Sequence, residues 1–247
     1  MIRMENLPPA PLLVRSWNVF HGNAHPPDRR SRLQTMIRLA SADRPDVLCL
    51  QELPLWALPR IARWSGMSAR WAVTREPWLP AWLGGGRIGG LVTRLNNGLL
   101  RSAISGQANA ILLAPDLVPL AHHVLRIDVG RREPRFCHAV QTERIVVANL
   151  HATNDFRDPS IPAAEIARAQ GFVTDLAGAL PCVLAGDFNL RAGQVPERAG
   201  WSALGSGIDH VLVRGLATTA LETWPEERRR HNGLVLSDHA PVEVTVG

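Results

Sequence analysis

The sequence predicts an α/β (α+β) fold with mixed β-sheets, many strands and few helices. Most apolar segments are short and continuous, as in strands that are covered on both faces. Only a few longer segments have the spacing of an amphipathic helix, and they do not alternate regularly with the strands. Because 46% of the 247 residues are hydrophobic, the chain can bury a large core.

The first predicted strand is Leu12–Trp17, and a loop that contains Pro26-Pro27 follows it. Asp28 is suited to cap the next helix, because a side-chain oxygen at this position accepts hydrogen bonds from the first free backbone amides. The apolar stripe of this helix is formed by Leu33, Ile37, Leu39 and Ala40.

A strand buried on both faces is predicted at Asp46–Leu50, which is a short apolar run. Leu55–Trp64 predicts a second helix that ends near Gly66, and Ala163–Leu180 predicts a third. Further strands are predicted at Arg70–Thr74, Ile88–Thr93, Ala108–Leu113, His122–Val129, Arg144–Leu150, Cys182–Ala185, His210–Val213 and Val242–Val246.

The net charge is +5, and the sequence contains arginine but no lysine. The planar guanidinium group grips phosphate oxygens at two points, so an excess of arginine suits a phosphate-bearing substrate. A bias in nucleotide composition that replaced lysine throughout is the simpler explanation for most surface arginines.

The cysteines are Cys49, Cys137 and Cys182. Their number is odd and two of them lie in apolar runs, which predicts buried free thiols in a reducing compartment. Met1–Pro11 lacks the apolar core of a signal peptide, and no apolar run is long enough to span a bilayer. We therefore expect a cytoplasmic protein.

No linker and no repeat of fixed period is found, so we predict a single domain over residues 1–247 with its core at about 12–246.

The segment Trp71–Gly90 is unusual, because Trp71, Trp78 and Trp82 surround prolines and precede a run of glycines. It is either an aromatic loop that touches bases or lipid, or a strand connection whose tryptophans pack on the core. The second interpretation is favoured, since scattered tryptophans are mostly buried.

Polar side chains end apolar runs at widely separated points of the chain. These points are Ser16-Trp17-Asn18, Leu50-Gln51-Glu52, Gly186–Asn189 and Ser237–Pro241. Strand ends are where a rigid scaffold presents chemistry. Hard oxygen donors combined with imidazoles therefore predict one composite site for a divalent cation and a phosphate.

Asp187 and Asn189 are two residues apart after a predicted strand, so their side chains face the same way while Phe188 packs inward. The carboxylate can hold and deprotonate a water molecule, and the amide can donate to a phosphate oxygen. The run Gly-Asp-x-Asn by itself is also common in simple turns.

A second pair combines Asp209 with His239. A carboxylate bonded to one imidazole nitrogen fixes the tautomer and raises the basicity of the other nitrogen. His210 is the competing histidine, but it begins an apolar strand, and we expect it to pack or to form a hydrogen bond in the interior.

In their order along the chain, these segments resemble the endonuclease/exonuclease/phosphatase superfamily, which includes DNase I-like nucleases. The resemblance implies a four-layer sandwich of two packed mixed β-sheets flanked by helices, with one divalent-metal site at one edge. The matching segments are Trp17-Asn18, Gln51-Glu52, Asn149-Leu150-His151, Gly186-Asp187-Phe188-Asn189, Ile208-Asp209-His210 and Ser237-Asp238-His239-Ala240-Pro241, with a weaker match at Asn109-Ala110-Ile111-Leu112.

The resemblance also implies a metal site in which Glu52 is the principal ligand and Asn18 and Asp238 lie near the metal. Mg²⁺ fits this oxygen-rich set best and Mn²⁺ is the alternative, since no cysteine has the spacing of a zinc site.

Catalytic roles follow from the same resemblance. Asp187 would position or activate the attacking water, and Asn189 would hold that water or the phosphate. His239, held by Asp209, would stabilise the phosphate in the transition state or act as a base. His151 would lie across the phosphate as a hydrogen-bond donor or as the acid for the leaving oxygen.

Asn154 and Asn109 match positions that contact the substrate in some members. Other positions depart from the pattern of the family. Phe20 stands where several members have an acidic residue near the metal, and Ala114 replaces a basic residue. His151 stands where abasic-site nucleases usually carry tyrosine. This difference favours the branches of the family that contain DNase I, sphingomyelinases and phosphoinositide phosphatases.

We expect a Mg²⁺-dependent phosphodiesterase or nuclease that acts on nucleic acid by in-line attack of water. The alternatives are a phosphatase or sphingomyelinase-like phospholipase acting on a small phosphate or a membrane lipid, and a non-catalytic binding module.

Arg228–His231, in an expected loop, would either bind further phosphates or form an ordinary solvated charge run. Arg168 and Gln170 would support the site or only cover a helix surface. No protein partner is predicted.

Overall fold

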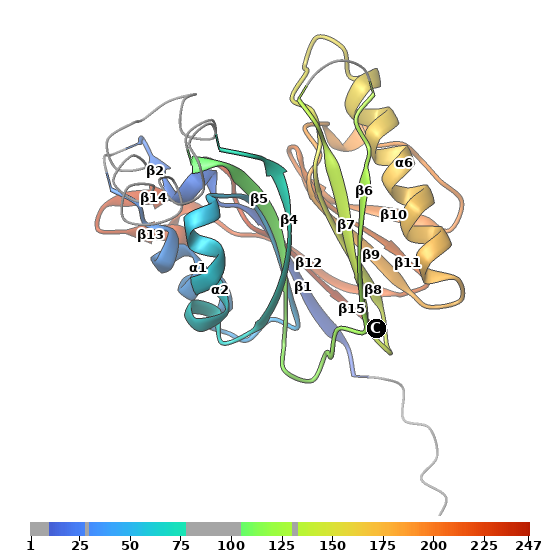
Figure 1. Cartoon of the computed structure of the whole chain (residues 1–247), viewed down its shortest axis with the longest axis horizontal. Helices are drawn as coiled ribbons and strands as arrows, with labels where there is room; N and C mark the ends of the chain where they lie inside the picture. The colour runs from blue at the N-terminus through green and yellow to red at the C-terminus, as the bar shows by residue number, and fades with distance from the viewer. Residues whose placement is uncertain (1–9, 28–29, 78–104, 130–132) are drawn as a thin grey trace, which may run out of the picture.

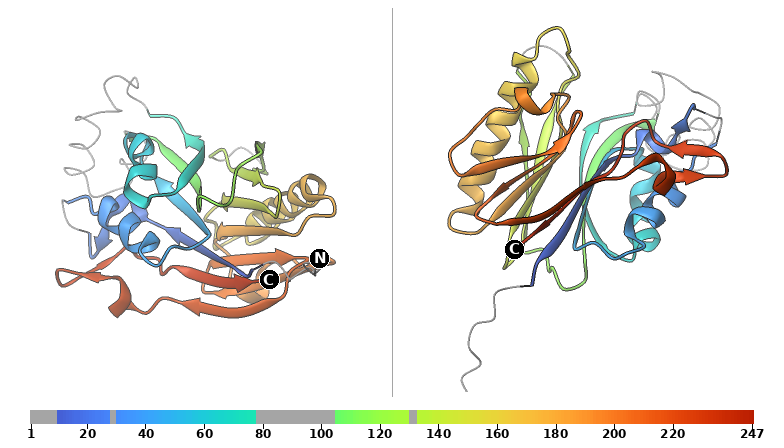
Figure 2. Two further views of the ribbon diagram at one scale, coloured as in Figure 1. Left: turned by 90° about the horizontal axis from the view of Figure 1, so that it is seen from below. Right: turned by 180° about the vertical axis from the view of Figure 1, so that it is seen from behind.

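The computed structural model describes residues 10–27, 30–77, 105–129 and 133–247. Two six-stranded sheets face each other and the longer helices lie against their outer faces (Figure 1). The views from below and from behind show the same arrangement of helices, sheet, sheet and helix (Figure 2). The predicted four-layer sandwich is therefore confirmed.

The first sheet has the strand order β12-β15-β1-β3-β5-β4. Its strands β1 and β3 are parallel and its other pairs are antiparallel, so the sheet is mixed. The bounds are β1 Leu12–Asn18, β3 Val47–Leu53, β4 Ser68–Arg75, β5 Gln107–Leu113, β12 Thr218–Thr223 and β15 Val242–Val246, and the covering helices are α1 Leu33–Ser41 and α2 Leu58–Ser65.

The second sheet has the order β10-β11-β9-β8-β7-β6, with β8 and β9 parallel. Its strands are β6 Ala121–Arg126, β7 Phe136–Gln141, β8 Val146–His151, β9 Cys182–Asp187, β10 Trp201–Ser206 and β11 Asp209–Arg214, and the helix on its outer face is α6 Ser160–Ala177.

A small third sheet, β13-β14-β2, lies beside the first one. Short 3₁₀ turns join several of the strands. The bounds are β2 Ala24–His25, β13 Arg230–His231, β14 Leu234–Leu236, η1 Phe20–Gly22, η2 Leu55–Ala57, η3 Ala192–Gln194 and η4 Glu226–Arg229.

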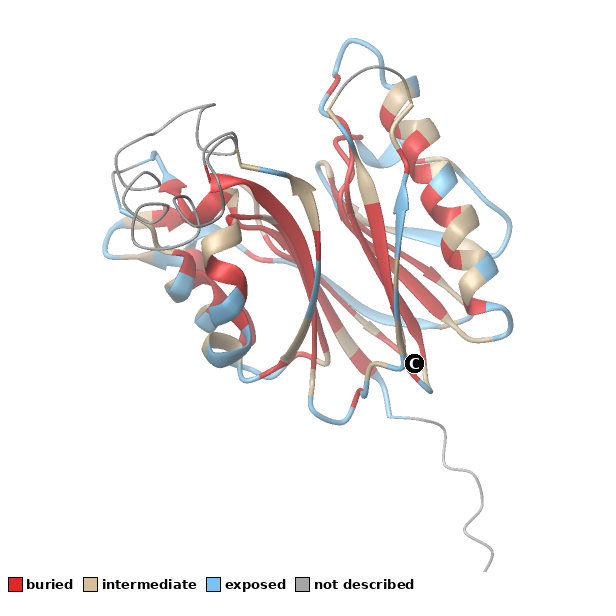
Figure 3. Ribbon diagram, in the orientation of Figure 1, coloured by how far each residue is buried: buried red, intermediate tan, exposed pale blue. Residues whose placement is uncertain are grey.

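Three apolar clusters hold the layers together. The first fills the space between the two sheets and includes Val14 and Val147. The second packs α1 and α2 on the first sheet and includes Met36, and the third packs α6 on the second sheet and includes Ile166. Central strands are therefore buried on both faces, which accounts for their short continuous apolar runs (Figure 3).

Several predicted elements differ from the observed ones. The predicted helix Leu55–Trp64 is divided into η2 and α2, and it ends, as expected, before a left-handed Gly66. The strand predicted at His122–Val129 ends at Arg126. Trp71 is 41% exposed in β4, so the expectation that it packs on the core is wrong. Asp28, Ile88–Thr93, Trp78 and Trp82 lie outside the described residues.

The three cysteines are free and buried, as predicted. Among the described helices, none combines the length and the apolar character that crossing a membrane requires.

Candidate active site

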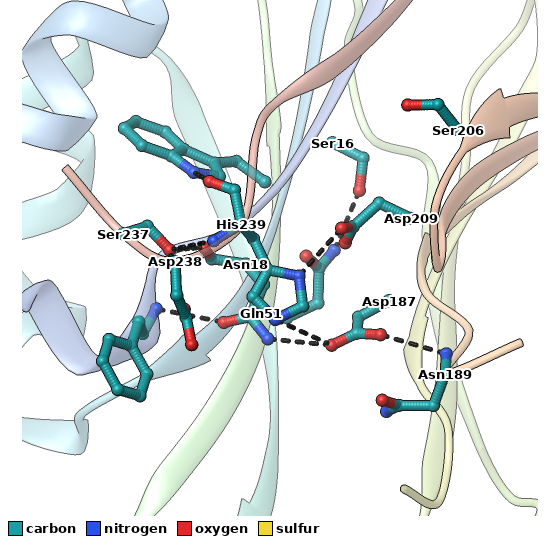
Figure 4. Close-up of polar contacts among 12 residues, drawn as sticks. Ser16, Asn18, Gln51, Asp187, Asn189, Ser206, Asp209, Ser237, Asp238 and His239 are labelled. Carbon is teal, nitrogen blue, oxygen red and sulfur yellow. Dashed lines mark hydrogen bonds and ion pairs between the residues drawn. The ribbon is translucent and has the colours of Figure 1, made fainter. Parts of the chain in front are cut away.

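The two parallel strand pairs end at the same edge of the sandwich. In the first sheet Asn18 lies beside Gln51, and in the second sheet His151 lies beside Asp187. Because the carboxyl ends of parallel strands meet at one edge, residues from distant parts of the chain converge there. Figure 4 shows Asn18, Asp187, Asp209 and His239 pointing toward one another.

Asn18 links the acidic groups of the two sheets. Its amide nitrogen donates to Glu52 Oε1 at 3.2 Å and to Asp187 Oδ2 at 3.0 Å. Its amide oxygen accepts from the backbone N–H of Phe20 at 3.0 Å. In this arrangement Asn18 holds two carboxylates through its nitrogen, and ligation of a metal by its oxygen would require the amide to turn.

Glu52 reaches the site through an irregular backbone. It has a φ of 57°, and the pairing of β3 with β5 shifts register between Leu50 and Leu53. A bulge redirects side chains near an active site. Here it lets Gln51 face the interior, where it donates to Asn149 Oδ1 at 2.8 Å, while Glu52 lies at the rim.

Burial raises the pKa of Glu52 above its usual value. Burial, followed by the charge of Asp209, raises the pKa of Asp187 to about 7. Both shifts mean that the ionised carboxylates are poorly compensated by the surrounding protein. A divalent cation bound by oxygen ligands would supply that compensation, so the residues present fit such a metal.

His239 and Asp209 form the predicted pair, with Nδ1 of the imidazole 2.8 Å from Asp209 Oδ2. His239 Nε2 lies 3.7 Å from Asp187 Oδ2. Burial alone would lower the pKa of His239, but the hydrogen bond and charge of Asp209 outweigh it and raise the pKa to about 10. His239 therefore carries a proton at neutral pH in the metal-free protein.

His151 faces both carboxylates from β8. Its Nε2 lies 3.5 Å from Asp187 Oδ2 and its Nδ1 lies 4.0 Å from Glu52 Oε1. Burial lowers the pKa of His151 well below its usual value, and the charges of Arg135 and His239 act in the same direction. His151 is therefore neutral, and a neutral imidazole can donate through only one of its nitrogens.

Asn189 follows Asp187 with a φ of 51°. Its backbone N–H donates to Asp187 Oδ1 at 3.0 Å, and its side-chain nitrogen donates to the carbonyl of Ala152 at 3.0 Å. Within the described part of the chain, its buried amide oxygen accepts no hydrogen bond. That oxygen is available to a water molecule or another ligand.

Two groups of ligands are available for a metal. One is Glu52 with the neighbouring Asp187, and the other combines Asp187, Asp209 and His239, whose candidate ligand atoms lie within 4.8 Å of one another. In the second group the hydrogen bond between Asp209 and His239 already uses one atom of each residue. Glu52 and Asp187, which the amide of Asn18 joins, offer an alternative centre for a cation, and Asp238 near them is exposed.

The two predicted substrate contacts have different surroundings. Asn154 is exposed just beyond His151. Asn109 is fully buried in β5, and neither of its amide atoms has a partner among the described residues. A contact of Asn109 with substrate stays a prediction.

His21 and Arg135 also lie near Glu52, although no sequence motif points to them. His21 Nε2 lies 3.6 Å from Glu52 Oε2, in a turn where His21 has a φ of 52°. Arg135 is close enough to lower the pKa of Glu52 against the opposing effect of burial. In a chain with so many arginines, no local signal distinguishes Arg135.

The basic run before the last strand stabilises the fold. Arg229 donates to the carbonyls of Leu236, Ser237 and His239, at 3.2, 2.9 and 3.1 Å. Arg228 stacks 3.8 Å from the centroid of a Trp224 ring and pairs with acidic residues. The expectation of a phosphate-binding loop is not supported for these two arginines, and Arg229 instead braces the segment that carries His239.

Arg168 and Gln170 hold neighbouring segments. Arg168 donates to the carbonyl of Asp128 at 3.0 Å, and Gln170 lies at 3.5 Å from the carbonyl of Pro196. His210 contacts the carbonyl of Leu190 at 2.8 Å and packs on Phe188, as expected for an interior role.

We predict that Gly186→Ala strongly destabilises the protein. Gly186 has a φ of 150°, and an added Cβ would lie 2.0 Å from the carbonyl oxygen of Leu150 on the adjacent strand. The strands that carry His151 and Asp187 would have to separate, which costs about 3 kcal/mol or more. Urea denaturation measures the change.

Gly193→Ala is the matched control, because a Cβ at Gly193 meets nothing within 4 Å. We expect it to change the free energy of unfolding by less than about 0.5 kcal/mol. Equal stability of the two variants would contradict the steric argument.

Comparisons with known proteins agree with this geometry. The family model described as the endonuclease/exonuclease/phosphatase family matches residues 16–239. A search of curated proteins finds no match. Similar solved structures include TDP2 from C. elegans, with a TM-score of 0.69, 16% identity and coverage of 99% of this chain and 77% of that one.

Two further structures have the same fold. The mannosyl-6-phosphatase Bt3783 of Bacteroides thetaiotaomicron has a TM-score of 0.68 and 15% identity, and the alignment covers 96% of this chain and 99% of that one. The human Nocturnin catalytic domain with bound sulfate has a TM-score of 0.63 and 14% identity, with coverage of 96% and 93%. With the family model matching almost the whole chain, the protein belongs to the endonuclease/exonuclease/phosphatase family.

Proposed function

We propose that the protein is a Mg²⁺-dependent phosphodiesterase that cleaves nucleic acid by in-line attack of water. Family membership supports phosphoester hydrolysis in general. One observation carries the specific proposal. The amide of Asn18 contacts two carboxylates, the buried Asp187 and the partly buried Glu52, beside a protonated His239 and a neutral His151. In this arrangement a carboxylate for a cation, Glu52, a base, Asp187, and the imidazoles of His151 and His239 lie next to one another.

Glu52 would hold the metal, with Asp238 and Asp187 nearby. Mg²⁺ suits carboxylate oxygens and Mn²⁺ is the alternative. When bound, the metal neutralises charge that develops on the phosphate oxygens.

Side chains of the protein would carry out the proton transfers and position the water and the phosphate. Asp187 accepts the proton of the attacking water, because its raised pKa makes it a usable base near neutrality. Asn189 holds the water, whose O–H can donate to its free amide oxygen. His239, kept protonated by Asp209, donates to a phosphate oxygen, and His151 donates to the leaving oxygen.

Nucleic acid is favoured as substrate for two reasons. The net charge is +5, and the positively charged Arg135 lies near Glu52 and His151. A cation so placed suits a phosphate with a negatively charged backbone on either side. The second candidate is phosphatase activity on a small phosphate, which gains support from the mannosyl-6-phosphatase that shares the fold.

The test is a panel of substrates with Mg²⁺ or Mn²⁺: plasmid DNA, single-stranded DNA, RNA, inositol phosphates, a sugar phosphate and sphingomyelin. We expect cleavage of at least one nucleic acid and complete loss of cleavage in EDTA. Turnover of a phosphomonoester or lipid with no cleavage of nucleic acid would replace the first proposal with the second. Absence of any metal affinity and any turnover would favour a binding module.

We predict that Glu52→Gln weakens Mg²⁺ binding at least about tenfold, because it removes the negative charge from the proposed principal ligand. Isothermal titration calorimetry measures this directly, without a substrate. The matched control is Glu76→Gln, which makes the same change of charge and size in the segment after β4. Equal Mg²⁺ affinity of wild-type protein and Glu52→Gln would exclude Glu52 as the principal ligand.

A further inference from the structure

The segment 152–159, between β8 and α6, begins directly after His151 and lies at the edge of the sandwich where the site is (Figure 1). Its first residue donates a backbone hydrogen bond to Asp187 O at 2.9 Å. Thr153 is fixed to α6, because its backbone N–H and its hydroxyl each bond a carboxylate oxygen of Glu165 at 2.7 Å. The segment therefore starts from a firmly held position.

Asp155 fixes the next part of this segment. It is only 8% exposed, and its Oδ1 accepts from the backbone N–H groups of Arg157 at 3.0 Å and Asp158 at 3.2 Å. With Thr153 and Asp155 turned inward, Asn154 and Phe156 are turned outward. Phe156 is 66% exposed, although its backbone lies between these anchored residues.

The Phe156 ring borders a pocket of about 280 Å³. Pro159 and Leu190 contribute apolar atoms to its lining, and Asn189, Arg191 and Gln194 contribute polar ones. Asn189 also bonds Asp187 and the carbonyl of Ala152, so the pocket adjoins the proposed reaction site.

We propose that this pocket binds a planar aromatic group of the phosphate ester, a nucleobase in a nucleic acid, stacked on Phe156. The inference rests on the proposed phosphodiesterase function and specifies which part of the substrate is recognised. Bases stack on aromatic side chains with little dependence on sequence, because every base has a π face. Because the backbone on both sides of Phe156 is already fixed, binding has to order only the side chain, which lowers the entropy cost.

The kinetic test uses two esters with the same leaving group, thymidine 5′-(p-nitrophenyl) phosphate and p-nitrophenyl phosphocholine. We expect Phe156→Ala to raise KM for the thymidine ester about tenfold, as one lost stacking contact would, with little change in kcat. KM for the choline ester should stay the same. Phe156→Trp should restore KM for the thymidine ester, whereas Phe156→Leu should not.

Val118→Ala is the control for loss of an exposed apolar side chain, because Val118 is 60% exposed in the connection between β5 and β6. It should leave both KM values unchanged. An equal rise for both esters that tryptophan reverses would mean that the nitrophenyl ring occupies the pocket, which also supports an aromatic occupant. An unchanged KM in Phe156→Ala, or rescue by leucine as complete as rescue by tryptophan, would overturn the inference.

Equilibrium binding tests the pocket independently of turnover. Fluorescence anisotropy in Ca²⁺ compares labelled oligothymidylate with an abasic oligonucleotide of the same length and charge. Wild-type protein should prefer the strand with bases, and Phe156→Ala should lose this preference. If wild-type protein cleaves no nucleic acid in the substrate panel, the proposed function fails. If wild-type protein shows no preference for the strand with bases, the pocket assignment is overturned, whether or not nucleic acid is cleaved.

Discussion

Asp187→Asn is expected to lower kcat by roughly 10³- to 10⁴-fold, as loss of a general base does, with a smaller change in KM. Asp187 Oδ1 already accepts the N–H of Asn189, so Oδ2 is the oxygen that faces Asn18, His151 and His239. Asparagine preserves the shape of the side chain. It cannot accept the proton of the attacking water.

Stability measurements distinguish this loss from unfolding. Burial raises the pKa of Asp187 to about 7, so above this pH the ionised carboxylate destabilises the metal-free fold. Asparagine removes that charge, and we expect the metal-free variant to have a Tm equal to or higher than that of wild-type protein near pH 8. Asp116→Asn, in an exposed turn after β5, is the matched control and should leave kcat unchanged. Nearly full activity of Asp187→Asn would exclude it as the base.

The sequence predicted most strands of the two large sheets, including the edge strands β4 and β6. Central strands are covered on both faces, so they appear as apolar runs. Three strands of the two large sheets were missed: β7, which contains His138 and Gln141, and the edge strands β10 and β12. The three short strands of the small sheet, β2, β13 and β14, were missed as well. Every residue of β12 is exposed, so backbone pairing with β15 holds it in place and no apolar pattern is needed.

Site residues could be predicted from the sequence where they belong to a short motif, and not where they stand alone. Residues such as Asp187 and His239 could be found because each belongs to a short run at a strand end. Arg135 and His21 could not, because each is a single residue of a type that occurs at many other positions. Asn109 shows the opposite case, in which a residue in a recognisable run is fully buried. Burial depends on the packing of both sheets, which a local pattern does not contain.

Asp209→Asn is expected to lower kcat by about 10³-fold or more, because a neutral amide cannot stabilise the imidazolium of His239 or fix its tautomer. Asp209 lies 2.8 Å from His239 Nδ1 and is the main cause of the raised pKa of His239. In the metal-free variant, NMR titration should therefore show a lower pKa for His239. A purely structural role for Asp209 would not predict that shift.

A double-mutant cycle with His239→Ala tests how Asp209 acts. If Asp209 only positions and charges His239, the double variant should be no slower than His239→Ala alone, because the interaction lost is the same one. Additive losses would mean that Asp209 acts separately, as expected if the metal were bound by Asp187, Asp209 and His239 instead of Glu52. Mg²⁺ affinity distinguishes the two metal sites independently of turnover. If Glu52 is the principal ligand, Asp209→Asn should leave the Mg²⁺ affinity nearly unchanged.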